Sequence, residues 1–359
     1  MSLDLKPFDA RTGIEEQRSL FLDCFPEHMG KPTGTREHYC WKFDSFPAVP
    51  RSYEYAAYAE LGMIGYYAAI PYSYKTGDRV SMAGMVCDVM TSSKARGKGV
   101  FTKLGRYSLD KLRENGIDFT TGYPIRPEVV PGHLKVGWKI VQRMPTFIKP
   151  IKSRSILGAK NLGMLSPFAD LAALLFRKAT TLKKVPTDYK VEFNDLKGFL
   201  RVSDYSDFLE RWIGSVPHAL IKDYDFLRWR LGAPGTKYEI ISVRSKAGKL
   251  LGVCICRKTE LTQIPTLAVL DIMILPENYD TFRVVDHALV QLAQSTKAEI
   301  IATMMSIPWA KKYGLYRRGY LKSSYVFSLI INKLNPELSD SEIFNPSNWH
   351  VMWIDSDDL

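Results

Sequence analysis

Hydrophobic positions in the first 150 residues alternate between the spacing of a helix and the spacing of a strand. Residues 12–29 have helical spacing, whereas residues 53–59 and 63–69 have the spacing and composition of strands. Residues 83–91, with the sequence AGMVCDVMT, predict a buried strand. Helical and strand patterns continue to alternate as far as residue 123. We therefore expect a mixed α/β domain built around one sheet.

A basic loop with two glycines follows the buried strand. Its sequence is Thr91-Ser-Ser-Lys-Ala-Arg-Gly-Lys-Gly99, and a helical pattern begins directly after it. A strand, a glycine turn and the start of a helix can present several backbone N–H groups to an anion. The loop is not a Walker loop, because Ser92 replaces its first glycine, nor a dinucleotide fingerprint, because Thr102 replaces the third. These features leave two interpretations open, a solvated basic turn and an anion-binding cradle.

The second half of the chain repeats landmarks of the first half in the same order. The matched pairs are Trp41-Lys42 with Trp229-Arg230, Cys87-Asp-Val-Met90 with Leu270-Asp-Ile-Met273, and Val136-Gly-Trp138 with Arg318-Gly-Tyr320. This order predicts a duplicated domain, with an N-terminal copy at 1–150, a linker with a helix at 151–190 and a C-terminal copy at 191–359. The counterpart of the glycine loop, residues 274–281, has no glycine and two acids. Only the first copy is expected to bind an anion there.

Two further segments have a predicted structure. Residues 166–184 have the pattern of a helix that begins at Ser166-Pro167. Its apolar part is shorter than the ~20 residues that a bilayer requires, so we expect it to pack between the domains. The aromatic tail at residues 349–355 can be a closing strand or a pocket wall, and its regular alternation favours the strand.

Composition narrows the partners and the compartment. A net charge of +11 favours anionic partners, which include phosphorylated small molecules, nucleic acid and acidic membrane surfaces. Nucleic acid is not expected, because no strand interleaves aromatic and basic residues as stacking platforms do. The five scattered cysteines predict reduced core thiols and no metal site. The N-terminus lacks the apolar core of a signal peptide, so a cytoplasmic location is expected.

The segment Lys94-Ala-Arg-Gly-Lys-Gly99 resembles the acyl-CoA signature of the GNAT superfamily of N-acyltransferases. That signature is Gln/Arg-x-x-Gly-x-Gly/Ala, and lysine replaces its usual first residue here. The strand before it, the helix after it and the pair Gly137-Trp138, where many members have Gly-Phe, are also similar to the family. The resemblance covers residues 1–150, and it reaches 191–359 only through the repeat. It implies two tandem GNAT-like domains, each a mixed and largely antiparallel sheet flanked by helices, of which one can bind acetyl-CoA or another acyl-CoA.

The resemblance also implies which residues bind the acyl-CoA. The N–H groups from Gly97 to Val100 would hold the pyrophosphate, and one N–H group of the preceding strand would polarise the thioester carbonyl. The implied binding residues are Val89, Met90, Thr91, Lys94, Ala95, Arg96, Gly97, Lys98, Gly99, Val100 and Phe101.

Three residues are candidates for proton transfer. His133 lies four residues before the Gly-aromatic pair, where family members commonly have a tyrosine that protonates the leaving thiolate, and a histidine can supply that proton. The alternative is a structural histidine in an amphipathic segment. Asp88 could deprotonate or orient the acceptor amine, although its counterpart Asp271 in the other copy favours a structural role. Glu128 is a third candidate.

The predicted function is an acetyl-CoA-dependent N-acyltransferase that acts on the primary amine of a small molecule. The positive charge favours an anionic or sugar-linked acceptor. One alternative is a Fem-like aminoacyl transferase that uses charged tRNA, although members of that group generally lack an intact glycine loop. A second alternative is a non-catalytic acyl-CoA-binding protein.

Overall fold

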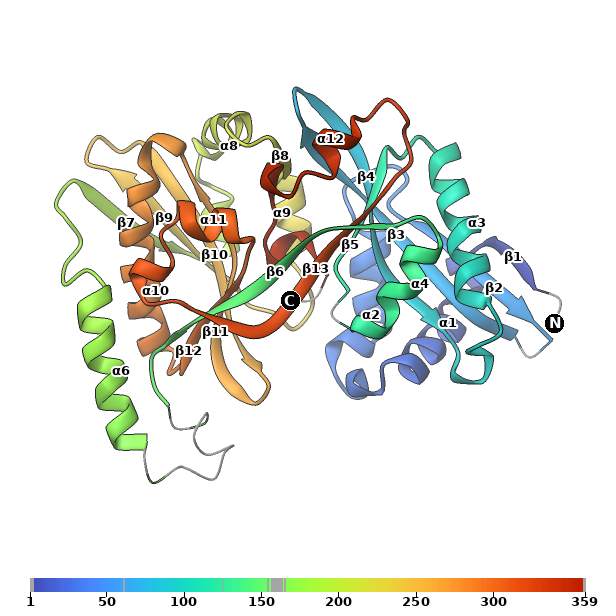
Figure 1. The fold of residues 1–359 in the computed structure, drawn as a ribbon, viewed down its shortest axis with the longest axis horizontal. Coiled ribbons are helices and arrows are strands. Elements are labelled where there is room, and N and C mark those ends of the chain that lie inside the picture. The colour runs from blue at the N-terminus through green and yellow to red at the C-terminus, as the bar shows by residue number, and fades with distance from the viewer. Residues whose placement is uncertain are drawn as a thin grey trace. The chain divides into compact units, whose positions relative to one another are not determined.

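The computed structural model describes residues 3–60, 62–124, 126–153, 155, 164 and 166–357. The chain folds into two compact units, and neither unit is continuous in sequence. Unit 1 consists of Met1–Gln142, His218–Thr236 and Ser328–Trp349, and unit 2 consists of Arg143–Pro217, Lys237–Phe327 and His350–Leu359. Figure 1 follows the chain through both units from its N-terminus to its C-terminus.

The sheet of unit 1 has the strand order β1-β2-β3-β4-β5-β13. Its strands are antiparallel to their neighbours except for β4 and β5, which are parallel. The strands are β1 (Asp4–Pro7), β2 (Tyr53–Ala59), β3 (Gly62–Thr76), β4 (Arg79–Thr91), β5 (Phe119–Gly122) and β13 (Leu321–Lys333). The helices of the first half are α1 (Ala10–Cys24), α2 (Arg36–Tyr39), α3 (Val100–Glu114) and α4 (Val130–Lys135). Later segments add β8 (His218–Leu220), α9 (Tyr224–Arg230), α12 (Asp340–Ile343) and β14 (Trp349–His350).

The predicted helices and strands of the first half are confirmed, with some different ends. Helix α1 begins after Asp9, whose side chain caps it by accepting a hydrogen bond from the backbone of Arg11. It ends at Cys24 rather than at residue 29, because Pro26 follows and a 3-10 turn takes over. Helix α3 buries its predicted apolar face, with Leu104 and Leu112 in the core beneath β2 and β3.

The sheet of unit 2 has the order β7-β9-β10-β11-β12-β6, and here β11 and β12 are the parallel pair. The strands are β6 (Lys139–Pro150), β7 (Tyr189–Asn194), β9 (Glu239–Ser245), β10 (Leu250–Leu261), β11 (Ile264–Ile274) and β12 (Ile300–Met304). The helices are α6 (Ser166–Thr180), α7 (Leu196–Phe199), α8 (Tyr205–Gly214), α10 (Phe282–Ser295) and α11 (Ile307–Lys312). Helix α10 follows β11 as α3 follows β4, and the α-helices and strands from β9 to β13 repeat the order of those from β2 to β6. The mixed, largely antiparallel tandem architecture is therefore confirmed.

The two halves exchange their last strands. Strand β6 belongs to the first half of the sequence but pairs with β12 in unit 2. Strand β13 belongs to the second half, and its residues Ile330–Lys333 pair with β5 in unit 1. The compact units consequently differ from the continuous ranges 1–150 and 191–359 that the sequence suggests.

The first matched pair of the repeat forms a direct contact within unit 1. The rings of Trp41 and Trp229 stack with centroids 5.3 Å apart and planes 11° apart. The indole N–H of Trp41 donates to the carbonyl oxygen of Trp229 at 2.7 Å, and that of Trp229 donates to the carbonyl oxygen of Trp41 at 2.9 Å. Trp41 and Trp229, which are equivalent residues of the two copies, thus contact each other through two reciprocal hydrogen bonds.

The predicted linker and tail have mixed outcomes. Helix α6 forms, but it ends at Thr180 and leaves most of its apolar side chains exposed, while its packing between the domains stays a prediction. Linker residues 154, 156–163 and 165 lie outside the described residues. The tail is a strand only at β14, and a 3-10 turn, Trp353–Asp355, follows. Its side chains from Trp349 to Ser356 are all buried, so their alternation does not mark a half-exposed strand. No helix among the described residues is long and apolar enough to cross a membrane.

Candidate active site

Strands β4 and β5 pair over a short distance only. Their register joins Ala83–Met85 to Phe119–Thr121, and β5 ends at Gly122. Strand β4 continues for six more residues to Thr91. Among the described residues, no strand pairs with β4 on that side beyond Met85. The open edge of β4 can therefore accept an extended ligand as an additional strand would be accepted.

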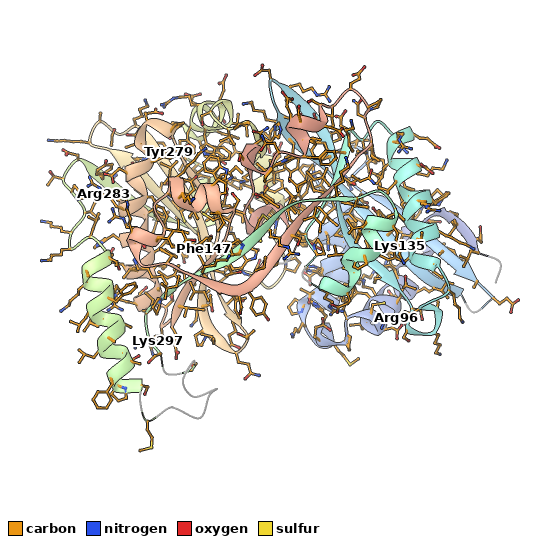
Figure 2. The ribbon with its side chains drawn as sticks, viewed as in Figure 1. Arg96, Lys135, Phe147, Tyr279, Arg283 and Lys297 are labelled. Carbon is orange, nitrogen blue, oxygen red and sulfur yellow. The ribbon has the colours of Figure 1, made fainter. Side chains whose placement is uncertain are left out.

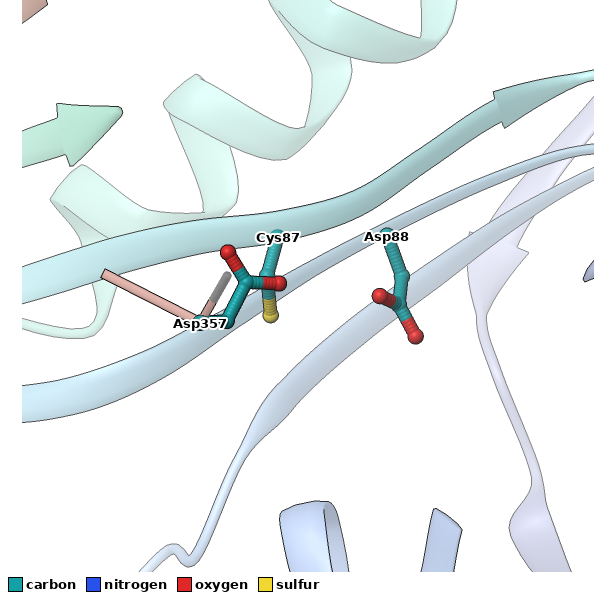
Figure 3. Close-up of side chains that lie close together, drawn as sticks. All are labelled: Cys87, Asp88 and Asp357. Carbon is teal, nitrogen blue, oxygen red and sulfur yellow. The ribbon is translucent and has the colours of Figure 1, made fainter. Parts of the chain in front are cut away.

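Strand β4 has a bulge at this open edge. Its pairing with β3 passes from Ala68↔Cys87 to Tyr66↔Met90, so one extra residue is accommodated on β4. Asp88 lies in the bulge with a φ of 47°, a left-handed conformation that aspartate tolerates better than most residues. Figure 3 shows Cys87 and Asp88 as neighbours on β4. The bulge changes the direction of the backbone at the point where the strand becomes free.

Asp88 is held in a buried group of three charges. Lys42 Nζ lies 2.8 Å from Asp88 Oδ1, and Arg18 Nη2 lies 3.6 Å from Asp88 Oδ2. Burial alone would raise the pKa of Asp88, but the two cations outweigh it and hold this pKa below its ordinary value. A carboxylate with a low pKa accepts a proton poorly. These contacts favour a structural role for Asp88 over that of the base considered from the sequence.

His133 lies in an aromatic environment. Its ring meets the rings of Phe101 and Trp138 edge to face, with centroids 5.1 Å away in each case. Its Nδ1 has no hydrogen-bond partner among the described residues, and burial lowers its pKa to about 4. At neutral pH the ring is therefore uncharged and carries no extra proton for a leaving thiolate. These contacts favour packing over the acid role, and Glu128 lies exposed on the turn before α4.

The burial of His133 makes stability depend on pH. The unfolded chain binds a proton at this ring near pH 6.5, whereas the folded chain resists it until about pH 4. The neutral ring therefore makes its full contribution to the free energy of unfolding above pH 6.5. This contribution, about 3 kcal/mol at most, is lost as the pH falls. We expect His133→Phe to reduce the slope of unfolding free energy against pH in this window, as measured by urea unfolding. An unchanged slope, or a variant of normal stability that loses turnover, would contradict the packing role.

The glycine loop leaves several backbone donors available. Gly97 and Gly99 have φ angles of 75° and 77°, which glycine adopts without strain, and a Cβ atom at either would meet no atom within 4 Å. Among the described residues, no acceptor is present for the N–H groups of Gly97, Gly99 and Val100. The start of α3 adds its positive dipole end at the same place. The loop is thus an open cradle of N–H groups.

Side chains fix this loop and give it charge. Asp23 at the end of α1 accepts hydrogen bonds from the backbone and hydroxyl of Ser93, both at 3.1 Å. The basic residues Lys94, Arg96 and Lys98 are all exposed, and Figure 2 labels Arg96 among the side chains of unit 1. The residues that the sequence predicted for acyl-CoA, from Val89 to Phe101, lie on three consecutive elements: the open edge of β4, the basic loop and the start of α3. The side chains of Met90, Ala95 and Val100 are buried, so these residues can offer only backbone groups to a ligand.

A pocket of about 490 Å³ lies in unit 1 beyond the end of α1. It is lined by Leu22, His28, Gly30, Lys31, Pro32, Gly34, Thr35, Glu37, Pro234 and Gly235. His28 Nδ1 lies 2.6 Å from the hydroxyl of Thr33, and the other ring nitrogen, Nε2, has no hydrogen-bond partner among the described residues. Burial lowers the pKa of His28, so its ring is neutral at pH 7. Lys31 and Glu37 bring opposite charges to the rim.

Hydrogen bonds and an ion pair connect the pocket with β4. Arg18 Nη1 donates to the carbonyl oxygen of Thr33 at 3.4 Å, and its Nη2 lies against Asp88. On the other side, Leu22 of the pocket adjoins Asp23, which binds the glycine loop. The end of α1 thus separates the pocket from the cradle. The sequence did not indicate His28, because nothing near it differs from an ordinary surface turn.

Comparison with known proteins identifies the class of this fold. Residues 14–141 match the family model described as an acetyltransferase (GNAT) domain. This match identifies residues 14–141 as a GNAT domain. A search of curated proteins finds no match to this chain.

Several solved structures share the fold of almost the whole chain. A probable N-acyltransferase from Enterococcus faecalis is 12% identical, with a TM-score of 0.66, over 93% of this chain and 73% of that one. A GCN5-related N-acetyltransferase from Anabaena variabilis is 13% identical, with a TM-score of 0.63, over the same shares. The N-myristoyltransferase of Saccharomyces cerevisiae, solved with bound myristoyl-CoA, is 11% identical, with a TM-score of 0.62, over 98% of this chain and 85% of that one. The likeness extends through both copies of the repeat.

Proposed function

We propose that this chain transfers an acyl group, in the first instance acetyl, from acyl-CoA to a primary amine that binds in the pocket at His28. The observation that carries the proposal is the open cradle of N–H groups at Gly97, Gly99 and Val100 beside the free edge of β4. Acyl-CoA supplies an activated thioester. In the transfer the acyl carbon bonds to the amine nitrogen, the bond to sulfur breaks, and one proton passes from nitrogen to the departing thiolate.

The residues of the loop and of β4 fit acyl-CoA. The N–H groups of the cradle and the exposed cations would bind the pyrophosphate, which needs both donors and positive charge. The open edge of β4, from Val89 to Thr91, would bind the pantetheine arm by backbone hydrogen bonds. An N–H group next to the bulge would polarise the thioester carbonyl. The myristoyl-CoA in the yeast N-myristoyltransferase structure supports this kind of donor.

The charged residues at the pocket indicate which kind of acceptor it can bind. Glu37 can bind an ammonium group and Lys31 an anionic group, so the pocket suits a small amine that also carries negative charge, such as a sugar-linked one. With Nδ1–H donating to the hydroxyl of Thr33, His28 presents the lone pair of Nε2 to the acceptor. Its role in this proposal is to take the proton that the amine must lose before it attacks.

The donor assignment can be tested at the cradle with a matched glycine. Gly97→Val and Gly99→Val should weaken acetyl-CoA binding ~10- to 100-fold, because a side chain would occupy the space of the phosphates and strain the left-handed turn. Gly116, at the other end of α3, has the same φ of 77° and equally open surroundings, so Gly116→Val adds equal strain without touching the cradle. Isothermal titration with acetyl-CoA measures all three variants. Equal losses in all three would overturn the assignment.

Release of free thiol from acetyl-CoA, measured against a panel of amino sugars and their phosphates, tests the reaction itself. We expect release only with acceptors that carry both an amine and negative charge. Substitutions at Asn278 and Asp280, in the loop of unit 2 that corresponds to the cradle, should leave binding and release unchanged. Binding of acetyl-CoA without thiol release for any amine would instead support a non-catalytic acyl-CoA-binding protein.

A further inference from the structure

Helix α6 exposes the apolar stripe that a surface helix normally buries. Phe168, Leu171 and Leu175 follow one another at helical spacing on one face, and they are 75%, 55% and 58% exposed. Ala173, on another face, is the only residue of this helix with a buried side chain. Figure 1 shows α6 at the margin of unit 2, beyond α10. An apolar stripe of this length on the surface indicates a binding site.

The helix is held in this orientation by polar contacts within unit 2. Asp170 accepts hydrogen bonds from the backbone and the hydroxyl of Ser153 at 2.6 and 2.7 Å. Arg177 Nη1 donates to the carbonyl oxygen of Ile151 at 3.1 Å. These bonds anchor α6 to the end of β6, on the side away from the exposed stripe. The exposure is therefore a result of how the helix is attached.

The charges near the stripe indicate an anionic partner. Lys178 lies in the last turn of α6, Lys183 and Lys184 follow it, and all three are exposed. No acidic residue occurs between Asp170 and Asp188, so these three cations are not balanced locally in the sequence. Interfacial helices combine an apolar face with cations, because the face enters the headgroup layer while the cations meet the lipid phosphates. A purely apolar protein partner would not require the cations.

The length of the helix decides how it would lie. Its 15 residues extend about 22 Å, which is less than the roughly 30 Å of a hydrocarbon core. We propose that α6 docks the chain on an anionic membrane surface, parallel to the bilayer, with Phe168, Leu171 and Leu175 in the headgroup region. The N-acyltransferase site would then operate at a lipid surface, and this inference stands independently of the identity of the acceptor.

Vesicle sedimentation tests this proposal with the full chain. The chain should sediment with vesicles of phosphatidylcholine and phosphatidylglycerol at low salt, and much less with vesicles of phosphatidylcholine alone or at high salt. The double variant Leu171→Glu/Leu175→Glu should bind the anionic vesicles ~10-fold or more weakly, because two charges would have to enter the headgroup layer. Leu321→Glu, on β13, is the matched control, since Leu321 is 56% exposed.

Charge is tested separately. Lys183→Gln/Lys184→Gln should weaken vesicle binding, whereas Lys246→Gln/Lys249→Gln, at two exposed lysines of the β9–β10 turn, should not. Equal binding of both vesicle types by the wild type, or unaltered binding by the Leu171→Glu/Leu175→Glu variant, would overturn the proposal. So would ultracentrifugation showing that these leucines hold two copies of the chain together without any vesicle binding. Acetyl-CoA titration should be normal in every variant, which separates this test from that of the catalytic site.

Discussion

The variant His28→Gln should lose ~100-fold or more in kcat, the usual scale for a positioned proton acceptor. Glutamine is similar in size and can still bond to Thr33, whose hydroxyl lies 2.6 Å from His28 Nδ1, but it cannot take a proton. Acetyl-CoA affinity should change little, because the cradle lies on the other side of the end of α1. Thiol release at saturating acetyl-CoA and acceptor measures the effect.

The pH profile gives an independent readout for the same residue. Burial lowers the pKa of His28, so the wild-type rate should fall only as the pH drops below the ordinary histidine range and the ring becomes protonated. His28→Gln should lack this acidic limb. Thr33→Val should shift the limb and lower kcat, and Thr33→Ser should restore both, because the serine hydroxyl can still fix the tautomer of His28.

A matched histidine serves as the control. His287 is also half-buried and bonded through Nδ1, to the carbonyl oxygen of Leu182 at 2.8 Å, but it lies in unit 2. His287→Gln should leave both kcat and the pH profile unchanged. If His28→Gln keeps the wild-type rate and acidic limb, the proton acceptor is another group, while the acyl-CoA assignment is still decided by the glycine variants.

Asp88→Ala should destabilise the fold by about 3–5 kcal/mol, the usual cost of breaking a buried ion pair. The side chains of Arg18, Lys42 and Asp88 are all 8% exposed or less, so the variant leaves two cations in the interior without their carboxylate. Asp88→Asn should lose most of the same stability, although asparagine tolerates the left-handed conformation at this position. This comparison separates the effect of charge from that of backbone conformation.

Urea unfolding measures these changes in stability. Two further variants serve as comparisons. Lys42→Met together with Asp88→Asn should be less destabilising than the sum of the single changes, because one unpaired cation is removed with the carboxylate. Asp110→Ala breaks an exposed pair with Arg113 and should leave stability nearly unchanged. If Asp88→Ala keeps wild-type stability but loses turnover with saturating substrates, Asp88 is a catalytic group and the structural assignment is wrong.

The sequence revealed the parts of this protein that consecutive residues encode. The strand at Ala83–Thr91, the glycine loop and helix α3 were predictable because hydrophobic periodicity, glycine and helix-start signals are local. The duplication was also predictable, since matched landmarks recur in order. Two glycines in one basic turn predicted left-handed backbone conformations, which strongly favour glycine, but only the resemblance to the GNAT signature favoured a cradle over a solvated turn.

Contacts between distant segments could not be derived in this way. The pairing of Asp88 joins α1, the π-helical segment after α2 (Cys40–Asp44) and β4, and it favours a buried ion partner over a base. For His133 a packing role is favoured in the same way, because the aromatic rings around it are those of Phe101 on α3 and of Trp138, the residue before β6. A residue type suggests a chemistry, but its pKa depends on neighbours that the sequence does not place.

The sequence by itself thus determined the GNAT-like elements, their order in the two halves and the location of the glycine loop, since each depends on short-range backbone preferences. Only the tertiary structure decided that the halves exchange β6 and β13, that His28 lines a pocket next to the end of α1, and that α6 turns its apolar stripe outward. The physical reason is that strand pairing, pockets and exposure depend on long-range packing, which brings together residues from segments far apart in the chain.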